Sequence, residues 1–194
     1  MKSIQPRIFF VLSLALMCTT VLAESAWVEE SNAHTRYVME AQAKLNPEAF
    51  SSLGIVSADS EVVDMGPGAY ERSQQLAREL IAGLEERKKT TEHPKVVQDL
   101  DILITALRDQ LETDALDRKY LLPSYNVAQS MFYGFRGLLD PRSDPARYPA
   151  ALERLKKYTG QADGYRPITE LARERTEERF AEPGLIGPYR GELE

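Results

Sequence analysis

Apolar side chains recur at steps of three and four residues along most of the chain after residue 26, which is the spacing of one face of an α-helix. The most regular run predicts a helix that ends near Pro123, and its apolar face comprises Val96, Leu100, Leu103, Leu107 and Leu111. Val97 and Ile104 lie beside this face and widen it. A face of this width is typical of a helix at the centre of a core.

The same spacing predicts three helices before this one. We expect them over residues 27–45, 47–53 and 69–89. Asn46 and Pro47 form a start signal for the short second helix, because asparagine caps helices well and proline fits the first helical position. The segment over residues 55–68 is expected to be irregular.

After the central helix, we expect helices over residues 125–141, 146–158 and 167–180. The aromatic density of the first of these predicts that it is buried. No alternating strand pattern of useful length occurs in the sequence. The sequence therefore predicts an all-α fold of six or seven helices with short loops. We expect these helices to be one part of a larger helical fold, so that the fold of this chain is incomplete.

The first residues have the composition of a secretory signal peptide. Lys2 and Arg7 form a positive start, residues 8–22 are mostly apolar, and Val21 and Ala23 place small side chains where a signal peptidase reads them. We therefore expect a signal over residues 1–23, cleavage after Ala23, a periplasmic or extracellular protein, and one helical region over residues 24–194. An uncleaved membrane anchor is the alternative, although a span needs about 20 apolar residues.

The single cysteine, Cys18, lies inside this signal, so the exported chain is expected to fold without disulfides. A lipoprotein signal at Cys18 would require a small preceding residue, and Met17 is bulky. The formal net charge is −6 and becomes more negative once Lys2 and Arg7 are removed. We expect no nucleic-acid partner and, after signal cleavage, no membrane partner, because phosphates and anionic lipids attract basic surfaces.

Two histidines are the first candidates for chemistry. His34 lies on the apolar face of the first predicted helix, where a metal ligand, an acid–base group and a partly buried structural histidine are the alternatives. No second histidine or cysteine stands three or four residues away, which favours the structural role. His93 precedes Pro94 and is expected to cap a turn. The two histidines do not supply a zinc ligand set, so we expect no metal-binding, cofactor-binding or catalytic residue in this chain.

Carboxylates are abundant, but most stand beside Arg or Lys on polar helix faces, as in "ARERTEERF" near the end of the chain. Local ion pairs on a solvated face are the expected role of such residues. Asp99 and Asp101 flank the central apolar face, and a hydrolase that uses this pair remains a third hypothesis. The serines lack the glycine frame of a nucleophile elbow.

Aromatic residues give two further candidates. Trp27 and the run Met131 to Tyr133 could stack on a ligand, although core packing is their commoner role. Gly134 and Gly137 follow within the same helix, where they lower helix propensity and either permit close packing or mark a kink.

Six segments, taken in order, resemble the N-terminal part of a bacterial family known as domain of unknown function 885. They are "LNPEAFSSLGI", "DLDILITALRDQLE", "YLLP", "FYGFRGLLD", "ALERLKKYTG" and "ELARERTEERFAEPGLIGPYRGELE". Each stretch is modest, but their order and spacing cover nearly all of the chain after the signal. The resemblance implies a helical, zinc-metallopeptidase-like protein in which the metal site lies further along a longer chain.

Neither "HE" nor "HH" occurs in this sequence, so no catalytic residue of that family can be assigned to a position here. The resemblance implies an exported helical fragment that is inactive alone, and that would need zinc only as part of a full-length member. Its partner would be the missing C-terminal portion or a peptide. The closing stretch "EPGLIGPYRGELE" has the glycine and proline content of an interior loop and fits this hypothesis. The alternative is a freestanding periplasmic helical module that binds a partner or peptide, with residues 55–68 and the aromatic run as candidate surfaces.

Overall fold

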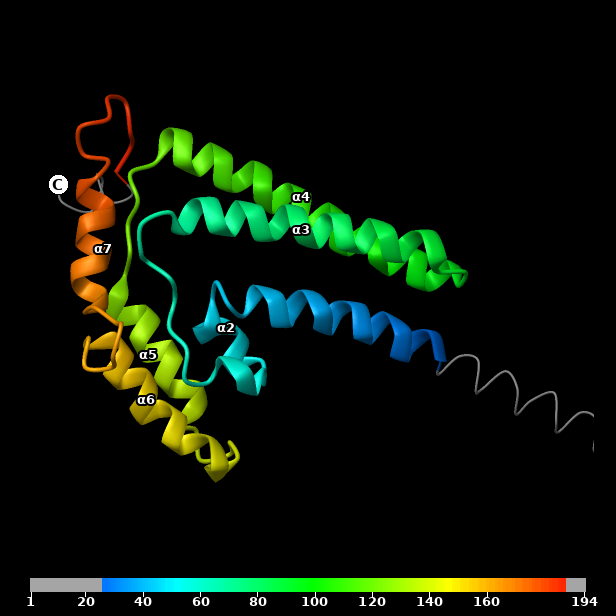
Figure 1. The fold of residues 1–194 in the computed structure, drawn as a ribbon, viewed down its shortest axis with the longest axis horizontal. Coiled ribbons are helices and arrows are strands. Elements are labelled where there is room, and N and C mark those ends of the chain that lie inside the picture. Colours follow the sequence, from blue (N-terminus) through cyan, green and yellow to red (C-terminus); the bar gives the residue numbers. More distant parts are fainter. Residues whose placement is uncertain (1–25, 188–194) are drawn as a thin grey trace, which may run out of the picture.

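A computed structural model describes residues 26–187, and the predicted signal peptide lies outside them (Figure 1). Within this range the fold is all-α, as predicted, with seven α-helices, two 3-10 turns and no strand beyond one isolated bridge between Leu121 and Ile186. The first helix covers residues 26–42. The others are α2 (Pro47–Ser52), α3 (Ala69–Thr90), α4 (Pro94–Tyr120), α5 (Val127–Leu138), α6 (Tyr148–Tyr158) and α7 (Ile168–Glu177), with the 3-10 turns η1 (Val56–Ala58) and η2 (Pro145–Arg147).

The long helices α3 and α4 form an antiparallel hairpin, and the helix over residues 26–42 runs beside it (Figure 1). Their shared core contains Val38, Leu80, Leu84, Val96, Leu100, Ile104 and Leu107, none of them more than 6% exposed. Val96, Leu100 and Leu107 belong to the apolar face predicted for α4, and Ile104 lies beside it, so the core position of this helix is confirmed. Pro94 occupies the first turn of α4, and His93 Nδ1 accepts a hydrogen bond from the Lys95 N–H over 3.3 Å, so the predicted capping role of His93 is also confirmed.

A second core joins α5, α6 and α7 to the segment that precedes α3. Its buried members are Met65, Tyr158, Ile168 and Ala172. The short helix α2 packs mainly against α5. Asn46 and Pro47 start α2 as predicted, although the Asn46 side chain makes no capping hydrogen bond, and Gly54 follows the helix with a φ of 91° that favours glycine.

Two arginines, of which Arg154 is fully buried and Arg147 partly buried, connect the irregular segment over residues 55–68 to this second core. Arg154 is fully buried and donates to the carbonyl oxygens of Glu61 (2.9 Å), Gly134 (2.5 Å) and Ala58 (2.5 Å). Arg147 binds both carboxylate oxygens of Asp59, at 2.6 and 2.7 Å. These contacts give a segment without regular secondary structure a fixed path, because each buried backbone carbonyl has a partner.

The prediction that the aromatic helix is buried is wrong for part of α5. Phe132 is 60% exposed and Tyr133 is 48% exposed, whereas Met131 and Phe135 pack against the second core. The helix is amphipathic, so Met131 and Phe135, one turn apart, lie on the face that packs against the core, and Phe132 and Tyr133 lie outside that face. Gly134 does permit close packing: a Cβ there would lie 2.8 Å from Oη of Tyr158 and 3.0 Å from Cγ of Glu48.

The helix ends also differ slightly from the predictions. The first helix ends at residue 42 instead of 45, and α7 ends at Glu177 instead of near Phe180. In both places the chain continues as turns, as is common where a last helical turn lacks packing.

Candidate functional site

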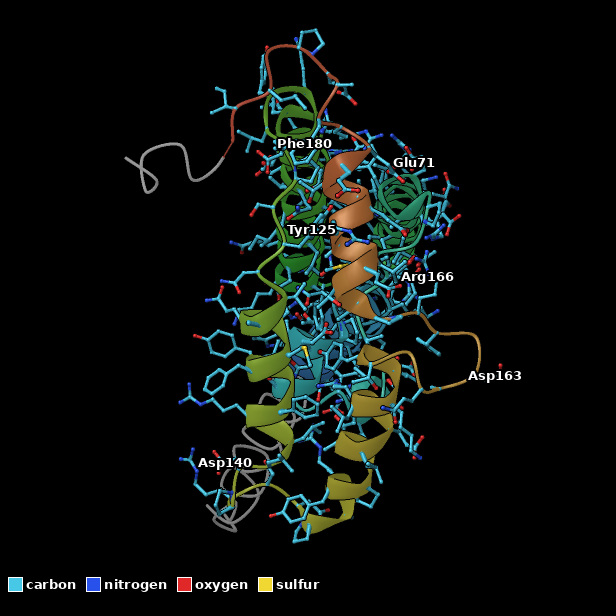
Figure 2. All side chains as sticks on the ribbon, turned by 90° about the vertical axis from the view of Figure 1, so that its left-hand side faces the viewer. Glu71, Tyr125, Asp140, Asp163, Arg166 and Phe180 are labelled. Carbon is cyan, nitrogen blue, oxygen red and sulfur yellow. The ribbon has the colours of Figure 1, made fainter. Side chains whose placement is uncertain are left out.

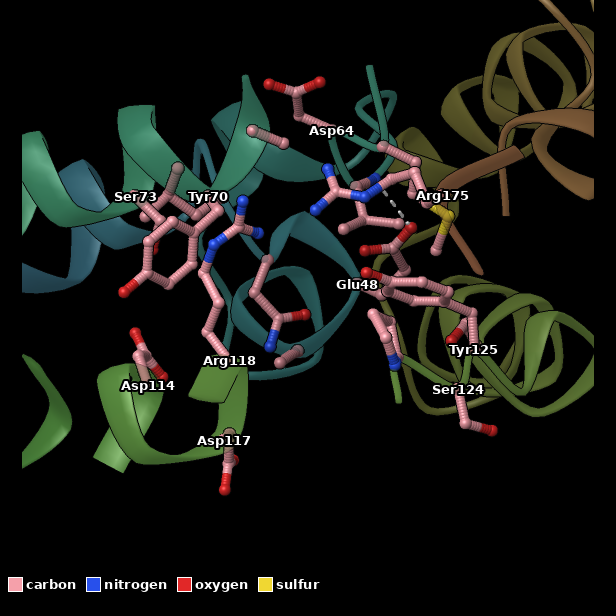
Figure 3. Close-up of a pocket in the computed structure, with 18 of the residues that line it drawn as sticks. Glu48, Asp64, Tyr70, Ser73, Asp114, Asp117, Arg118, Ser124, Tyr125 and Arg175 are labelled. Carbon is pink, nitrogen blue, oxygen red and sulfur yellow. Dashed lines mark hydrogen bonds between the residues drawn. The ribbon is translucent and has the colours of Figure 1, made fainter. Parts of the chain in front are cut away.

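An open groove of about 1020 Å³ lies between the α3–α4 hairpin and the α5–α7 group. Its walls come from α2, the start of α3, the end of α4, the connecting segment over residues 121–125, and one side each of α5 and α7. Figure 3 shows side chains from these elements converging on the groove. The groove therefore lies where the two cores meet, which is a common position for ligand sites.

Three tyrosines line the groove, namely Tyr70 on α3, Tyr125 before α5 and Tyr133 on α5. Tyr70 and Tyr125 are partly exposed, and Tyr133 is 48% exposed. Leu121, Leu122, Pro123 and Met65 add apolar surface between them. A wall of this kind offers stacking surfaces and hydroxyl groups together, which are features of sites that bind peptides.

Charged side chains of both signs line the same groove. Arg118 and Arg175 line the groove, and each guanidinium group has only one polar partner among the described residues: Glu71 for Arg118 and the Gly66 carbonyl for Arg175. On the α4 side, Asp114 accepts hydrogen bonds from Gln74 (3.3 Å) and Gln110 (2.5 Å), and no cation pairs with it or with Asp117 among the described residues. The groove thus presents unneutralised charges of both signs to a ligand.

Glu48 forms part of the groove floor. Its Oε1 atom accepts the hydroxyl proton of Tyr158 over 2.7 Å and the N–H of Val63 over 3.0 Å. Burial and the Glu48 carboxylate raise the pKa of Tyr158 well above its ordinary value, so the hydroxyl stays protonated and keeps donating. A carboxylate held this way fixes α2 against α6.

Arg179 closes the end of the groove between α7 and α4. It is 7% exposed, pairs with Glu182 at 2.7 Å, and donates to the carbonyl oxygens of Leu121 and Arg118. These carbonyls belong to the C-terminal end of α4, where a cation is favourable. Arg179 therefore holds the groove walls together.

The histidine candidates do not reach the groove. His34 sits between the first helix and α3, with Nδ1 3.5 Å from Nη1 of Arg87 and Nε2 4.0 Å from Glu30. Burial and the nearby Arg87 lower the pKa of His34, so it is neutral at pH 7. The rings of His93 and Trp27 are stacked, with their centroids 5.7 Å apart. The two side chains therefore pack against each other.

The two aspartates of the hydrolase hypothesis face different neighbours. Asp99 accepts a hydrogen bond from Ser31, and Asp101 pairs with Lys88 at 2.5 Å on an exposed surface. Neither lines the groove. The structure does not bring these carboxylates to a common cleft, which two-carboxylate hydrolysis requires.

Two of the candidate surfaces predicted from the sequence contribute to the groove: Tyr133 of the aromatic run, and Val63 to Met65 of the segment over residues 55–68. The other groove residues were not predicted. Arg175 belongs to the "ARERTEERF" stretch that was interpreted as a solvated face with local ion pairs. That interpretation holds for Arg173, which lies 3.7 Å from Glu177, but Arg175 turns into the groove. No pattern in the sequence distinguishes Arg175 from its neighbours or marks Tyr125 as a groove residue.

Across residues 26–187, no three histidine, cysteine or acidic side chains are grouped so that they could hold a metal ion. None of the helices in this range has the length and apolar character needed to cross a membrane. No family model, curated protein or solved structure matches the chain.

Proposed function

We propose that this chain is an exported helical module whose groove binds an extended segment of polypeptide. The observation that supports this most is the combination, along one open cavity, of three tyrosines and unneutralised charges of both signs. A polypeptide carries apolar, hydrogen-bonding and charged groups at short intervals, so it complements such a wall along its length. In this proposal the described residues bind and do not hydrolyse.

Retention of peptides on the immobilised protein tests this proposal. A synthetic library of mixed octapeptides is applied, and retained peptides are quantified by mass spectrometry. Tyr70→Ala and Tyr133→Ala should each reduce retention about tenfold, because aromatic anchors dominate such contacts. Neither side chain belongs to the two cores, so both variants should keep the circular dichroism and melting curve of the parent.

Tyr148→Ala is the matched control, because Tyr148 is also an exposed tyrosine (37%) but lies outside the groove. It should retain peptides as the parent does. Equal retention by all four proteins, or none by the parent, would refute the proposal.

A second candidate function follows from the resemblance to the metallopeptidase-like family. In it, the chain forms the N-terminal helical part of a larger zinc peptidase, is inactive alone, and delivers substrate to a metal-bearing portion. The observation that favours it is a set of exposed large apolar side chains on and beside α5 and α6, seen from their side in Figure 2. They are Phe132, Tyr133, Leu139, Tyr148, Leu152 and Leu155. Contiguous exposed apolar surface of this kind marks interaction sites.

The coding DNA beyond codon 194 tests this second function directly. A continuation in any frame that encodes a helical zinc motif would support it. An unrelated gene after a well-placed stop codon, together with a monomeric and cooperatively melting product, would count against it.

A further inference from the structure

Two arginines of the groove have guanidinium groups whose donors are mostly unused. Arg118, on the last turns of α4, makes no hydrogen bond through its guanidinium within the described chain. Its Cζ atom lies 4.4 Å from the centre of the Tyr70 ring, and one Nη atom lies 3.6 Å from a carboxylate oxygen of Glu71. The side chain is 42% exposed, so this distant surface pair is weak.

Arg175, on α7, approaches from the other side of the groove. Its Nη1 atom donates to the Gly66 carbonyl oxygen over 3.3 Å, and its Cζ atom lies 5.8 Å from the centre of the Tyr125 ring. No carboxylate among the described residues lies within ion-pair distance of it. Each guanidinium therefore lies near a tyrosine ring, and the only acidic partner of the two among the described residues is Glu71, in a distant and exposed pair with Arg118.

Two other arginines near the groove use their guanidinium N–H groups in ion pairs and in hydrogen bonds to backbone carbonyls. Arg179 pairs with Glu182 and donates to two backbone carbonyls. Arg72 binds Asp64 at 2.6 Å and donates to the Pro67 carbonyl over 2.8 Å. Among the arginines that line the groove or border it, Arg118 and Arg175 thus differ from Arg179 and Arg72 in their unused donors.

Figure 3 shows the guanidinium groups of Arg118 and Arg175 pointing into the same part of the groove, flanked by Tyr70 and Tyr125. Glu48 lies on the floor nearby, but its Oε1 atom is occupied by the Tyr158 hydroxyl and the Val63 N–H. Two cations directed at one space repel each other unless an anion lies between them. Arginine binds a carboxylate through two parallel N–H groups and stacks on aromatic rings at the same time.

The geometry points to a subsite between Arg118 and Arg175 that holds a carboxylate of the bound polypeptide. This inference rests on the proposed peptide-binding function and adds its specificity: the groove selects peptides with an acidic group at one position. The carboxylate is either an Asp or Glu side chain or the free C-terminus of the peptide. Asp114 and Asp117, on the α4 side of the groove, disfavour a second acidic group there.

The test compares peptides that differ only in this group. From the retained octapeptides, one sequence is prepared with its acidic residue as Asp or Asn, and with a free acid or an amide at its C-terminus. The parent protein should bind one acidic form at least about tenfold more tightly than its neutral counterpart, as expected for a charge-assisted hydrogen bond. The substitution that causes the loss, Asp to Asn or acid to amide, identifies the source of the carboxylate.

Arg175→Gln and Arg118→Gln should each remove this preference, so that each variant binds the acidic and the neutral peptide with affinities within about twofold of each other. Arg173→Gln is the control, since Arg173 lies on the same helix but its side chain is 67% exposed and paired with Glu177. A preference that survives in both groove variants, or that Arg173→Gln also removes, would overturn the subsite.

A second measurement separates this inference from the proposed function. Succinate is titrated into the labelled protein, and the Nε–Hε signals of Arg118 and Arg175, assigned through their Gln variants, are followed by NMR. Shifts of both signals that saturate together, without a shift of Arg173, support the subsite even if no peptide is retained. If peptides are retained without any preference for acidic forms and succinate shifts neither signal, the subsite is refuted and the groove function stands.

Discussion

The hydroxyl of Tyr158 on α6 donates to the carboxylate of Glu48 on α2 over 2.7 Å, and both side chains are almost fully buried. The two residues lie 110 positions apart in the sequence. Their contact holds the shortest helix of the fold in place as the floor of the groove. The position of the groove floor therefore depends on a buried hydrogen bond between distant parts of the chain.

Tyr158→Phe should lower the free energy of unfolding by about 1–3 kcal/mol, because the Glu48 carboxylate would stay buried with one fewer donor. Urea denaturation followed by circular dichroism measures this change. Tyr148→Phe removes an exposed hydroxyl instead and should change stability by less than about 0.5 kcal/mol. Equal changes in the free energy of unfolding for the two variants would mean that the buried hydrogen bond between Tyr158 and Glu48 does not stabilise the fold.

The sign of the stability change caused by Gly134→Ala tests how closely α5 packs against its neighbours. In an ordinary helix this substitution stabilises by up to about 1 kcal/mol. Here the new Cβ would lie 2.8 Å from Oη of Tyr158, so we expect a net loss of about 1–3 kcal/mol in the free energy of unfolding. Ser130→Ala, at a partly exposed position of the same helix, should be close to neutral. Stabilisation by Gly134→Ala would contradict the close packing of α5 on α2 and α6.

Asp59 should make the protein sensitive to acid. Burial would raise its pKa, but hydrogen bonds from Arg147 and Ser51 outweigh this effect and hold the pKa below its ordinary value. A depressed folded-state pKa means that the unfolded chain binds the proton first. The stabilisation is therefore complete above the ordinary aspartate pKa, near 4, and is lost as the pH falls through the lower folded-state value.

Asp59→Asn should lower the free energy of unfolding at pH 7 by about 3 kcal/mol, because Arg147 would be left buried without its partner. The variant should also show a shallower loss of stability between pH 5 and the acid end of the titration. Asp64→Asn, which removes an exposed partner of Arg72, is the control and should change both properties little. A variant with the parent's full acid dependence would show that another carboxylate controls it.

Export should remove the first 23 residues. N-terminal sequencing of the protein recovered from the periplasm or medium should begin at Glu24. Ala23→Leu should block processing and leave the precursor in the membrane fraction, because the peptidase requires a small residue there. A mature protein that retains its first residues would instead favour the uncleaved anchor.

The sequence predicted the helices well because their apolar spacing, prolines and glycines are local signals. Leu100 and Leu107 lie in the core as the periodicity of α4 indicated, and Pro94 starts that helix. The exposure of Phe132 was missed because composition does not indicate which side of a helix finds a partner.

The groove could not be predicted from the sequence, because its walls come from segments far apart in the chain. Tyr70 and Arg118 stand 48 positions apart and meet only when α3 and α4 pair. Arg175 was indistinguishable in sequence from its neighbour Arg173, and only the orientation of α7 separates their roles. Periodicity alone carries no information about such long-range contacts.

The central claim is that polypeptide binds in the groove, and photo-crosslinking tests it most directly. A benzoylphenylalanine is placed at position 133, in the groove, or at position 148, outside it, and each protein is irradiated with the octapeptide library. The account predicts crosslinked peptide at position 133, competed by unlabelled peptide, and none at position 148. Equal crosslinking at both positions, or crosslinking at 148 alone, would contradict it.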